Sequence, residues 1–179
     1  MILLTNQKKR MRSLMKFKFY DTCSLLEQAG NLFTSNDFTL VISSITLKEL
    51  EHIKSSYNKD ADVKFAARKV LADLEAHYGQ FKIVMFEEKY VGPLLSAGLP
   101  HSEDLKIISC AVEFANHHMD DEIIFVTNDL LCRHIASIYF KVEKVTEEDL
   151  EMVNRMKSTF MPGKKIAAIS ASVGTYFNA

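Results

Sequence analysis

The sequence lacks the features that mark secreted, membrane-spanning and uniformly basic proteins. Its three cysteines, Cys23, Cys110 and Cys132, are an odd number without C-x-x-C spacing, which predicts free thiols in a reducing cytoplasm. No apolar run approaches the roughly 18 residues that a membrane span needs. The basic residues near the N-terminus follow a short apolar stretch, which is the reverse of a signal peptide. A net charge of -1 argues against a generally basic coat for nucleic acid. We therefore expect a cytoplasmic protein without membrane contact.

The composition is that of one ordinary globular domain. A chain of 179 residues with 47% apolar residues is long enough to bury a sizeable core. Residues 1–14 are polar and basic without periodicity, so we expect an unstructured leader there. Residues 15–145 carry the patterned domain, and residues 146–179 are expected to form one more helix and a weakly patterned tail. The sequence contains no internal repeat and no low-complexity tract.

Short apolar runs alternate with amphipathic stretches along residues 15–145. An alternation of lysine and aromatic residues predicts a strand at 16–20, and apolar runs predict strands at 39–43, 81–86, 123–127 and 139–145. The amphipathic stretches predict helices at 24–27, 45–56, 62–77, 102–118 and 130–138. Parallel strands need crossover connections, and helices usually supply them. The sequence therefore predicts an α/β fold of three layers, α/β/α, with a central and mostly parallel sheet of about five strands.

Two aspartates directly follow predicted strands. Asp21 comes after the first strand, and Asp129 follows the fourth strand in the stretch IIFVTNDLLCRHIA. Ligand sites in open α/β sheets lie at the carboxyl ends of the strands. An aspartate at a helix start is also an ordinary N-cap, so each of the two taken alone is open to either interpretation.

Two further acids lie on helices. Glu49 follows Thr46 at the spacing of a capping box, which by itself would explain it. Asp104 is harder to explain as a structural residue. Its spacing from Ile108 and Ala111 places it on the side of the helix that faces the core. Ser102 is the better cap of that helix, and an unpaired buried carboxylate costs several kcal/mol.

If the four carboxylates meet at one edge of the sheet, their mutual repulsion raises their pKa values unless they share a cation. Ligand sets made only of oxygen suit Mg²⁺ or Mn²⁺. A metal held in this way can neutralise a phosphodiester and activate a water molecule for its hydrolysis.

At this point the sequence resembles the PIN domains, a family of metal-dependent nucleases. The resemblance covers about residues 15–145, and its motifs are FYDTCSLL, SSITLKELEHIK, SEDLKIISCAVEFA and IIFVTNDLLCRHIA. It implies that an acidic cluster holds Mg²⁺ or Mn²⁺, made of Asp21, Glu49, Asp104 and Asp129. It also implies supporting residues that orient carboxylates or water, namely Thr22, Thr127 and Asn128. Cys23 departs from the pattern, because such domains more often have Asn or Ser at this position.

The resemblance implies an endoribonuclease that leaves a 5′-phosphate, with RNA or single-stranded DNA as its nucleic-acid partner. Two biological roles are compatible with this resemblance: a toxin of a toxin–antitoxin pair and an RNA-processing enzyme. An antitoxin or another protein partner is also compatible with it, and so is a homodimer. Three alternatives remain open: a structure-specific DNA nuclease, a non-catalytic PIN-fold module, and a receiver-like domain of similar topology. A phosphatase with an aspartyl nucleophile is disfavoured, because Cys23 stands where a second aspartate is needed.

Other groups of reactive residues have simpler explanations. Residues 117–121 (HHMDD) resemble a metal cluster, but they fall at a helix end where histidine and aspartate are common. Gly163-Lys164-Lys165 lacks the other residues of a phosphate-binding loop. Cys23 as a nucleophile has no histidine placed nearby in the pattern. Several basic residues lie around and after Glu49, and any near the acidic edge would hold substrate phosphates: Lys48, Lys54, Lys59, Lys64, Arg68 and Lys69.

Overall fold

A five-stranded sheet forms the centre of the computed structural model, which describes residues 14–146 and residue 151. Its strands are β1 (Lys16–Tyr20), β2 (Thr39–Ser43), β3 (Lys82–Val84), β4 (Glu122–Val126) and β5 (Lys141–Glu143). Their order in the sheet is β3-β2-β1-β4-β5, and every neighbouring pair is parallel. The predicted parallel sheet is confirmed.

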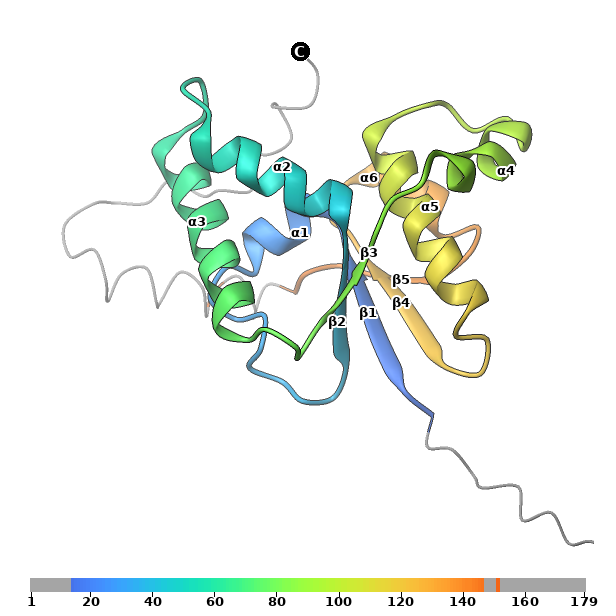
Figure 1. Ribbon diagram of the computed structural model, residues 1–179, viewed down its shortest axis with the longest axis horizontal. Helices are drawn as coiled ribbons and strands as arrows, with labels where there is room; N and C mark the ends of the chain where they lie inside the picture. Colours follow the sequence, from blue (N-terminus) through green and yellow to red (C-terminus); the bar gives the residue numbers. More distant parts are fainter. Residues whose placement is uncertain (1–13, 147–150, 152–179) are drawn as a thin grey trace, which may run out of the picture.

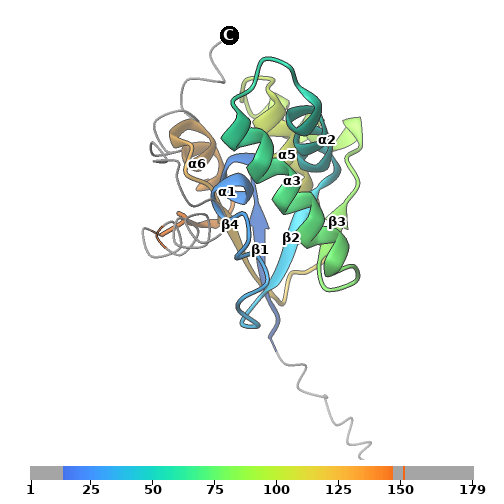
Figure 2. The ribbon, with the colours of Figure 1, turned by 90° about the vertical axis from the view of Figure 1, so that its left-hand side faces the viewer.

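Helices cover both faces of this sheet (Figure 1; Figure 2). They are α1 (Thr22–Glu27), α2 (Ser44–Ser55), α3 (Ala61–Ala76), the short 3₁₀ helix η1 (Glu88–Tyr90), α4 (Val91–Ser96), α5 (Glu103–Asn116) and α6 (Leu130–Ala136). One buried cluster joins the sheet to α1, α2 and α3, and a second joins the other face to α4, α5 and α6. This confirms the three-layer α/β/α architecture.

The alternation of side chains along β1 and β4 explains how both layers attach. Phe17, Phe19 and Phe125 are buried on the face toward α5, whereas Ile124 and Val126 are buried on the opposite face. Strand β4 (EIIFV) buries both faces with a nearly continuous apolar sequence, whereas β1 (KFKFY) alternates lysine and phenylalanine and contributes to the opposite face only through Tyr20. Each fully buried side chain of this size contributes roughly 1.5 to 3 kcal/mol.

The strand order reverses between β1 and β4, and this reversal positions the candidate site. From β1 the chain proceeds to β2 and β3 on one side, and β4 and β5 lie on the other. The last paired residues of the two central strands are Tyr20 and Val126, and the Asp21 N–H donates to the Val126 carbonyl at 3.2 Å. The crossovers diverge at this point, so a crevice opens at the carboxyl ends of the strands.

Two strands are shorter than predicted. The strand expected at 81–86 ends at Val84, because the Phe86 N–H donates to the Ser44 hydroxyl at 2.9 Å instead of continuing the ladder. The strand expected at 139–145 begins only at Lys141, because the N–H groups of residues 139 and 140 are bonded to the Ala136 carbonyl at the end of α6.

A third difference is a helix in the segment predicted to be a loop. Helix α4 includes Gly92 and Pro93, and it buries Val91 and Leu94. Proline is tolerated in the first turn of a helix, where its missing N–H would have had no partner. Burial of the two apolar side chains therefore outweighs the turn signal of Gly92-Pro93.

The predicted leader at 1–14 and the predicted helix and tail at 146–179 fall almost wholly outside the described residues, as does Gly163-Lys164-Lys165. Within the described part of the chain, no helix is both long enough and apolar enough to cross a membrane.

Candidate active site

Asp21 connects β1 to α1 and is almost completely buried. It is the N-cap of α1, and its Oδ1 accepts a hydrogen bond from the Ser24 N–H at 2.7 Å. Its Oδ2 accepts a hydrogen bond from the Thr127 hydroxyl at the end of β4. The capping interpretation of Asp21 is thus correct, but it accounts for only one of the two carboxylate oxygens.

Asp129 repeats this arrangement on the neighbouring strand. It is the N-cap of α6, and its Oδ1 accepts from the Cys132 N–H at 2.7 Å. Its own N–H donates to the Thr127 hydroxyl at 3.1 Å. The fully buried Thr127 hydroxyl therefore contacts both aspartates, which places Thr127 where a supporting residue was predicted.

The expected capping box at Thr46 and Glu49 is wrong. Helix α2 begins earlier, and its N-cap is Ser43, whose hydroxyl accepts from the Thr46 N–H at 3.0 Å. Thr46 is buried inside the helix, and the Glu49 carboxylate accepts instead from the Thr22 hydroxyl on α1. Glu49 is thereby turned toward the start of α1, and Thr22 is its support.

Asp104 lies in the first turn of α5, and the cap of that helix is Ser102, as predicted, with the Leu105 N–H donating to its hydroxyl at 3.1 Å. Asp104 is partly buried and is not needed as a cap. Burial raises its pKa first, and the charges of Asp129 and Glu103 raise it further.

These four acids come from four different elements and line one small pocket. The pocket has a volume of about 40 Å³, and its remaining walls are Thr22, Cys23 and Ile107. No basic residue lines it, and none of the four acids forms an ion pair with a described Lys, Arg or His. Within residues 14–146 and 151, the fold thus gathers like charges without a basic side chain beside them.

The side chains do not stand in a ready-made coordination sphere. Among residues 14–146 and 151, no three His, Cys, Asp or Glu side chains are arranged so that they could hold a metal ion. Three of the carboxylates already accept hydrogen bonds from the protein. Asp21 accepts from the Thr127 hydroxyl and an N–H of α1, Glu49 accepts from the Thr22 hydroxyl, and Asp129 accepts from an N–H of α6. The donor set itself, four carboxylates beside two hydroxyls, suits Mg²⁺ or Mn²⁺, which take oxygen ligands.

Burial is the main electrostatic effect at the site. It raises the pKa of Asp21 to about 6, although the hydrogen bonds from Thr127 and Ser24 act in the opposite direction. It raises the pKa of Glu49 to about 7, opposed by the bond from Thr22 and reinforced by Asp104, Glu103 and Asp21. Both carboxylates therefore resist ionisation more strongly than free side chains do.

Cys23 lines the same pocket but is not suited to act as a nucleophile. Burial, together with the charge of Asp21, raises the pKa of its thiol far above the ordinary value. A thiol that stays protonated is a poor nucleophile, so the position at a helix start does not activate it. All three cysteines are free thiols, as predicted.

Asn128 does not line the pocket, and its side chain is bonded to residues outside the four acids. Its amide N–H donates to Glu27 at the end of α1, and its Oδ1 accepts from the Val145 N–H at 3.0 Å. It therefore fixes the turn between β4 and α6 to its neighbours, and its role in orienting carboxylates or water stays a prediction.

Glu27 is a buried acid that the sequence prediction missed. It is only 7% exposed, and burial raises its pKa to about 7, with a further contribution from Asp21. The available signal was a glutamate directly after Leu25 and Leu26, on a helix of only six residues, almost all of which are buried.

The histidines of HHMDD have structural roles. His117 is the C-cap of α5, and His118 packs against Phe114 and Phe17 with ring centroids 4.1 and 5.0 Å away. The alternative of a metal cluster at residues 117–121 is not supported within the described chain.

A model of the PIN domain family matches residues 19–144 of the chain. The chain belongs to the PIN domain family. This match includes all four acids and extends from the end of β1 to beyond β5. PIN domains are generally nucleases, and the nucleases among them generally use divalent metals.

Two solved structures are similar to this PIN domain. One is VapBC-1 from nontypeable Haemophilus influenzae, at 17% identity over 72% of this chain and 97% of that chain, with a TM-score of 0.41. The other is the RRP44 PIN domain of T. brucei, at 12% identity over 88% of this chain and 94% of that chain, with a TM-score of 0.44. Among curated proteins, a pyruvate carboxylase subunit from Methanothermobacter thermautotrophicus is 55% identical over 38 residues. That match covers 21% of this chain and 8% of that protein.

Proposed function

We propose that this PIN domain is a divalent-metal-dependent endoribonuclease. The observation that carries the proposal is the pocket at the strand-order reversal, where four carboxylates from four elements meet and no basic residue of the described part of the chain lines the pocket. A purely structural cluster of acids would be expected to include a lysine or arginine, because unpaired buried charges destabilise a fold. A cation supplied from solution balances the same charges.

The residues have separate tasks in this proposal. Asp21, Glu49, Asp104 and Asp129 would hold Mg²⁺ or Mn²⁺. Bound there, the metal would neutralise the phosphodiester and lower the pKa of a water molecule, so that hydrolysis leaves a 5′-phosphate. The Thr127 hydroxyl keeps Asp21 directed at the pocket, and the Thr22 hydroxyl does the same for Glu49.

The proposal places RNA in the role of substrate and the cytoplasm as the compartment, consistent with three free thiols. A toxin of a toxin–antitoxin pair and an RNA-processing enzyme are its two biological settings. An antitoxin peptide would cover the acidic pocket. If a short reading frame beside the gene for this protein encodes a product that blocks cleavage, the protein is the toxin of such a pair. A homodimer is tested by the mass of the protein in solution.

The deciding experiment is incubation of the protein with mixed RNA and single-stranded DNA, in Mn²⁺, in Mg²⁺ and in chelator. We expect metal-dependent cleavage of RNA that Asp104→Asn abolishes and that Asp62→Asn, an exposed acid on α3, leaves intact. Cleavage of DNA alone would support a structure-specific DNA nuclease instead. Binding of RNA without cleavage in any metal would make the domain a non-catalytic module.

A stability measurement separates the proposed role of Asp104 from a structural one. Asn in its place removes a carboxylate whose pKa burial raises, so the metal-free variant should be as stable as the unchanged protein or more stable. A structural Asp104 would instead lose stability on the same change.

A further inference from the structure

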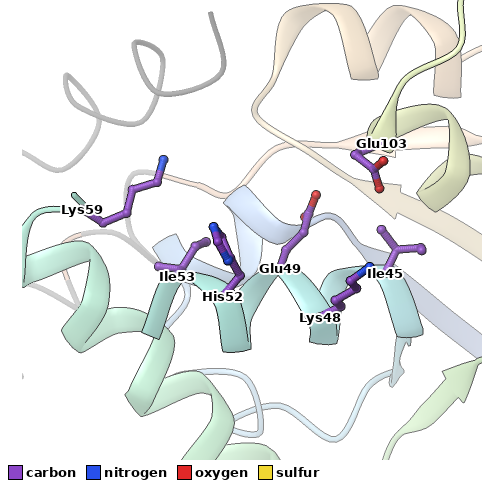
Figure 3. Close-up of a pocket in the computed structure, with 7 residues that line it drawn as sticks. All are labelled: Ile45, Lys48, Glu49, His52, Ile53, Lys59 and Glu103. Atoms are coloured by element: carbon purple, nitrogen blue, oxygen red, sulfur yellow. The ribbon is translucent and has the colours of Figure 1, made fainter. Parts of the chain in front are cut away.

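A second and larger pocket adjoins the acidic one and shares Glu49 with it. Its volume is about 370 Å³, within the range of pockets that bind small ligands. Figure 3 shows the residues that line it: Ile45, Lys48, Glu49, His52, Ile53, Lys59 and Glu103. Neither the proposed catalytic cluster nor its supporting hydroxyls account for this space.

The pocket follows one face of α2. Five lining residues belong to α2, and the last four of them follow Ile45 by three, four, seven and eight positions. These spacings place all five on one side of the helix, over a length of about 12 Å. In Figure 3, Glu49 and His52 project from the same side of α2, and Glu103 at the start of α5 faces them across the space. Lys59, from the segment between α2 and α3, closes the far end.

The charges of this face differ along its length. Glu49 and Glu103 lie where the pocket meets the acidic cluster, whereas Lys48, His52 and Lys59 provide cationic or potentially cationic groups. The two lysines of α2 also differ from each other. Lys54 is paired with Glu51 at 2.7 Å and does not line the pocket, whereas Lys48 lines it and forms no ion pair within residues 14–146 and 151.

This combination fits one unstacked nucleotide. A phosphate is attracted to the lysines, the isoleucines provide an apolar floor, and an imidazole ring can stack on a base. A nucleotide within a duplex is stacked and paired, so it cannot enter such a pocket without leaving its strand partner. The shared Glu49 makes the occupant a direct neighbour of the phosphodiester at the acidic cluster.

We propose that the α2 pocket binds the nucleotide flanking the cleaved phosphodiester of single-stranded RNA. Lys48 binds its phosphate, and His52 stacks on its base above Ile45 and Ile53. This inference rests on the proposed nuclease function and adds to it the place on this chain where the nucleotide next to the cleaved bond is held.

The experiment compares Lys48→Ala with its matched control Lys54→Ala, using a short fluorescent single-stranded oligoribonucleotide. Lys48→Ala should raise KM about fivefold with kcat nearly unchanged, because one ionic contact to substrate is lost. It should also reduce the slope of log Kd against log salt by about 0.7, the value for one phosphate contact on a single strand. Lys54→Ala should change neither quantity.

His52 is tested in the same assay. His52→Ala should raise KM about fivefold through the loss of a stacking partner, and His52→Phe should restore it because a ring is present again. A His52→Phe protein as weak as His52→Ala would overturn the stacking role.

Binding of the same oligonucleotide to Asp104→Asn protein, with and without Lys48→Ala, separates this inference from the proposed function. Equal effects of Lys48→Ala and Lys54→Ala on a protein that cleaves RNA would overturn the pocket and leave the nuclease standing. Binding that depends on Lys48 in a protein that never cleaves would support the pocket and overturn the nuclease. RNA that binds to no variant overturns both.

Discussion

Helices α1 and α6 begin in the same way, yet their capping aspartates lie in opposite environments. Asp21 and Asp129 each follow a central strand, and each accepts a hydrogen bond of 2.7 Å from the N–H three residues later. Asp21 is only 3% exposed, and burial raises its pKa to about 6. Asp129 is exposed to solvent at the mouth of the same pocket.

The comparison shows that capping and burial control different properties. The cap fixes where each carboxylate lies, because the N–H groups at a helix start position its oxygen. Burial makes the charge of Asp21 costly, whereas water still solvates Asp129. A cation bound between them would therefore relieve Asp21 more than Asp129, although both would hold it.

The largest expected effect is on cleavage and is common to both aspartates. Under the proposed function, Asp21→Asn and Asp129→Asn should each reduce the rate by orders of magnitude, because each removes a charge that would help to hold the metal. Initial rates on single-stranded RNA in Mn²⁺ provide the measurement, with Asp62→Asn as control. An Asp129→Asn protein that folds normally and cuts at the unchanged rate would reduce this residue to a cap.

Stability in Mn²⁺ should show the next largest effect. A ligand that binds only the folded protein stabilises it by about 2.7 kcal/mol at a hundredfold excess over its Kd. Thermal melts with and without millimolar Mn²⁺ should therefore differ, and Asp21→Asn should remove most of the difference. Coincident melts of the unchanged protein would count against a metal site.

The raised pKa values predict how stability depends on pH without metal. The folded pKa values of Asp21 and Glu49, about 6 and about 7, lie above those of the unfolded chain. The folded state therefore binds more protons between about pH 4 and 7, and its stability must fall as pH rises through that range. Urea melts at pH 5 and pH 8 measure the change. A free energy of unfolding that rises with pH would contradict the burial of these groups as the controlling factor.

The same titration should have the opposite consequence once metal is present. Metal binds the ionised carboxylates and competes with protons, so its affinity rises through the same pH range. Saturating Mn²⁺ should then weaken or reverse the loss of stability toward pH 8.

The sequence was sufficient to predict the five strands. It was also sufficient to predict that Asp21 and Asp129 lie at strand ends and that Asp104 lies on the core-facing side of its helix. A short apolar run rich in β-branched and aromatic residues, such as IIFVT, favours a strand that is buried on both faces, and an acid that follows such a strand closely lies at the carboxyl edge of the sheet. Glu49 was grouped with the other three acids only through the resemblance, because local spacing favoured a capping box. The true cap, Ser43, ends the preceding strand, so the boundary between strand and helix concealed it.

Pairings between distant segments could not be predicted from local patterns. The bond from Thr127 to Asp21 joins residues 106 positions apart, and the bond from Asn128 to Glu27 joins residues 101 positions apart. The α2 pocket likewise depends on Glu103 approaching from another helix. Such contacts follow from the strand order β3-β2-β1-β4-β5, which the alternation of elements does not specify.

Thr127 connects the two aspartates, so its removal tests whether they form a unit. Thr127→Val keeps the shape but leaves Asp21 and the Asp129 N–H without their shared hydroxyl, which should cost about 1 to 3 kcal/mol. Thr127→Ser retains the hydroxyl and is the matched control. Both variants are measured by urea denaturation, and equal stability of Val and Ser would show that the short contact to Asp21 contributes little.

The smallest expected effect separates the capping role of Asp129 from its charge. Asn caps a helix about as well as Asp, so Asp129→Asn should change the free energy of unfolding of the metal-free protein by less than about 1 kcal/mol. Asp129→Ala removes the acceptor for the Cys132 N–H and should cost about 1 kcal/mol more than Asn does. Cleavage should nevertheless be lost in both, because neither supplies the negative charge. Capping alone predicts a different order, in which Asn matches the unchanged protein in stability and cleavage and only Ala is impaired. Urea melts and cleavage rates of the two variants, measured side by side, therefore determine whether α6 needs only a cap at its start or the active site needs a carboxylate there.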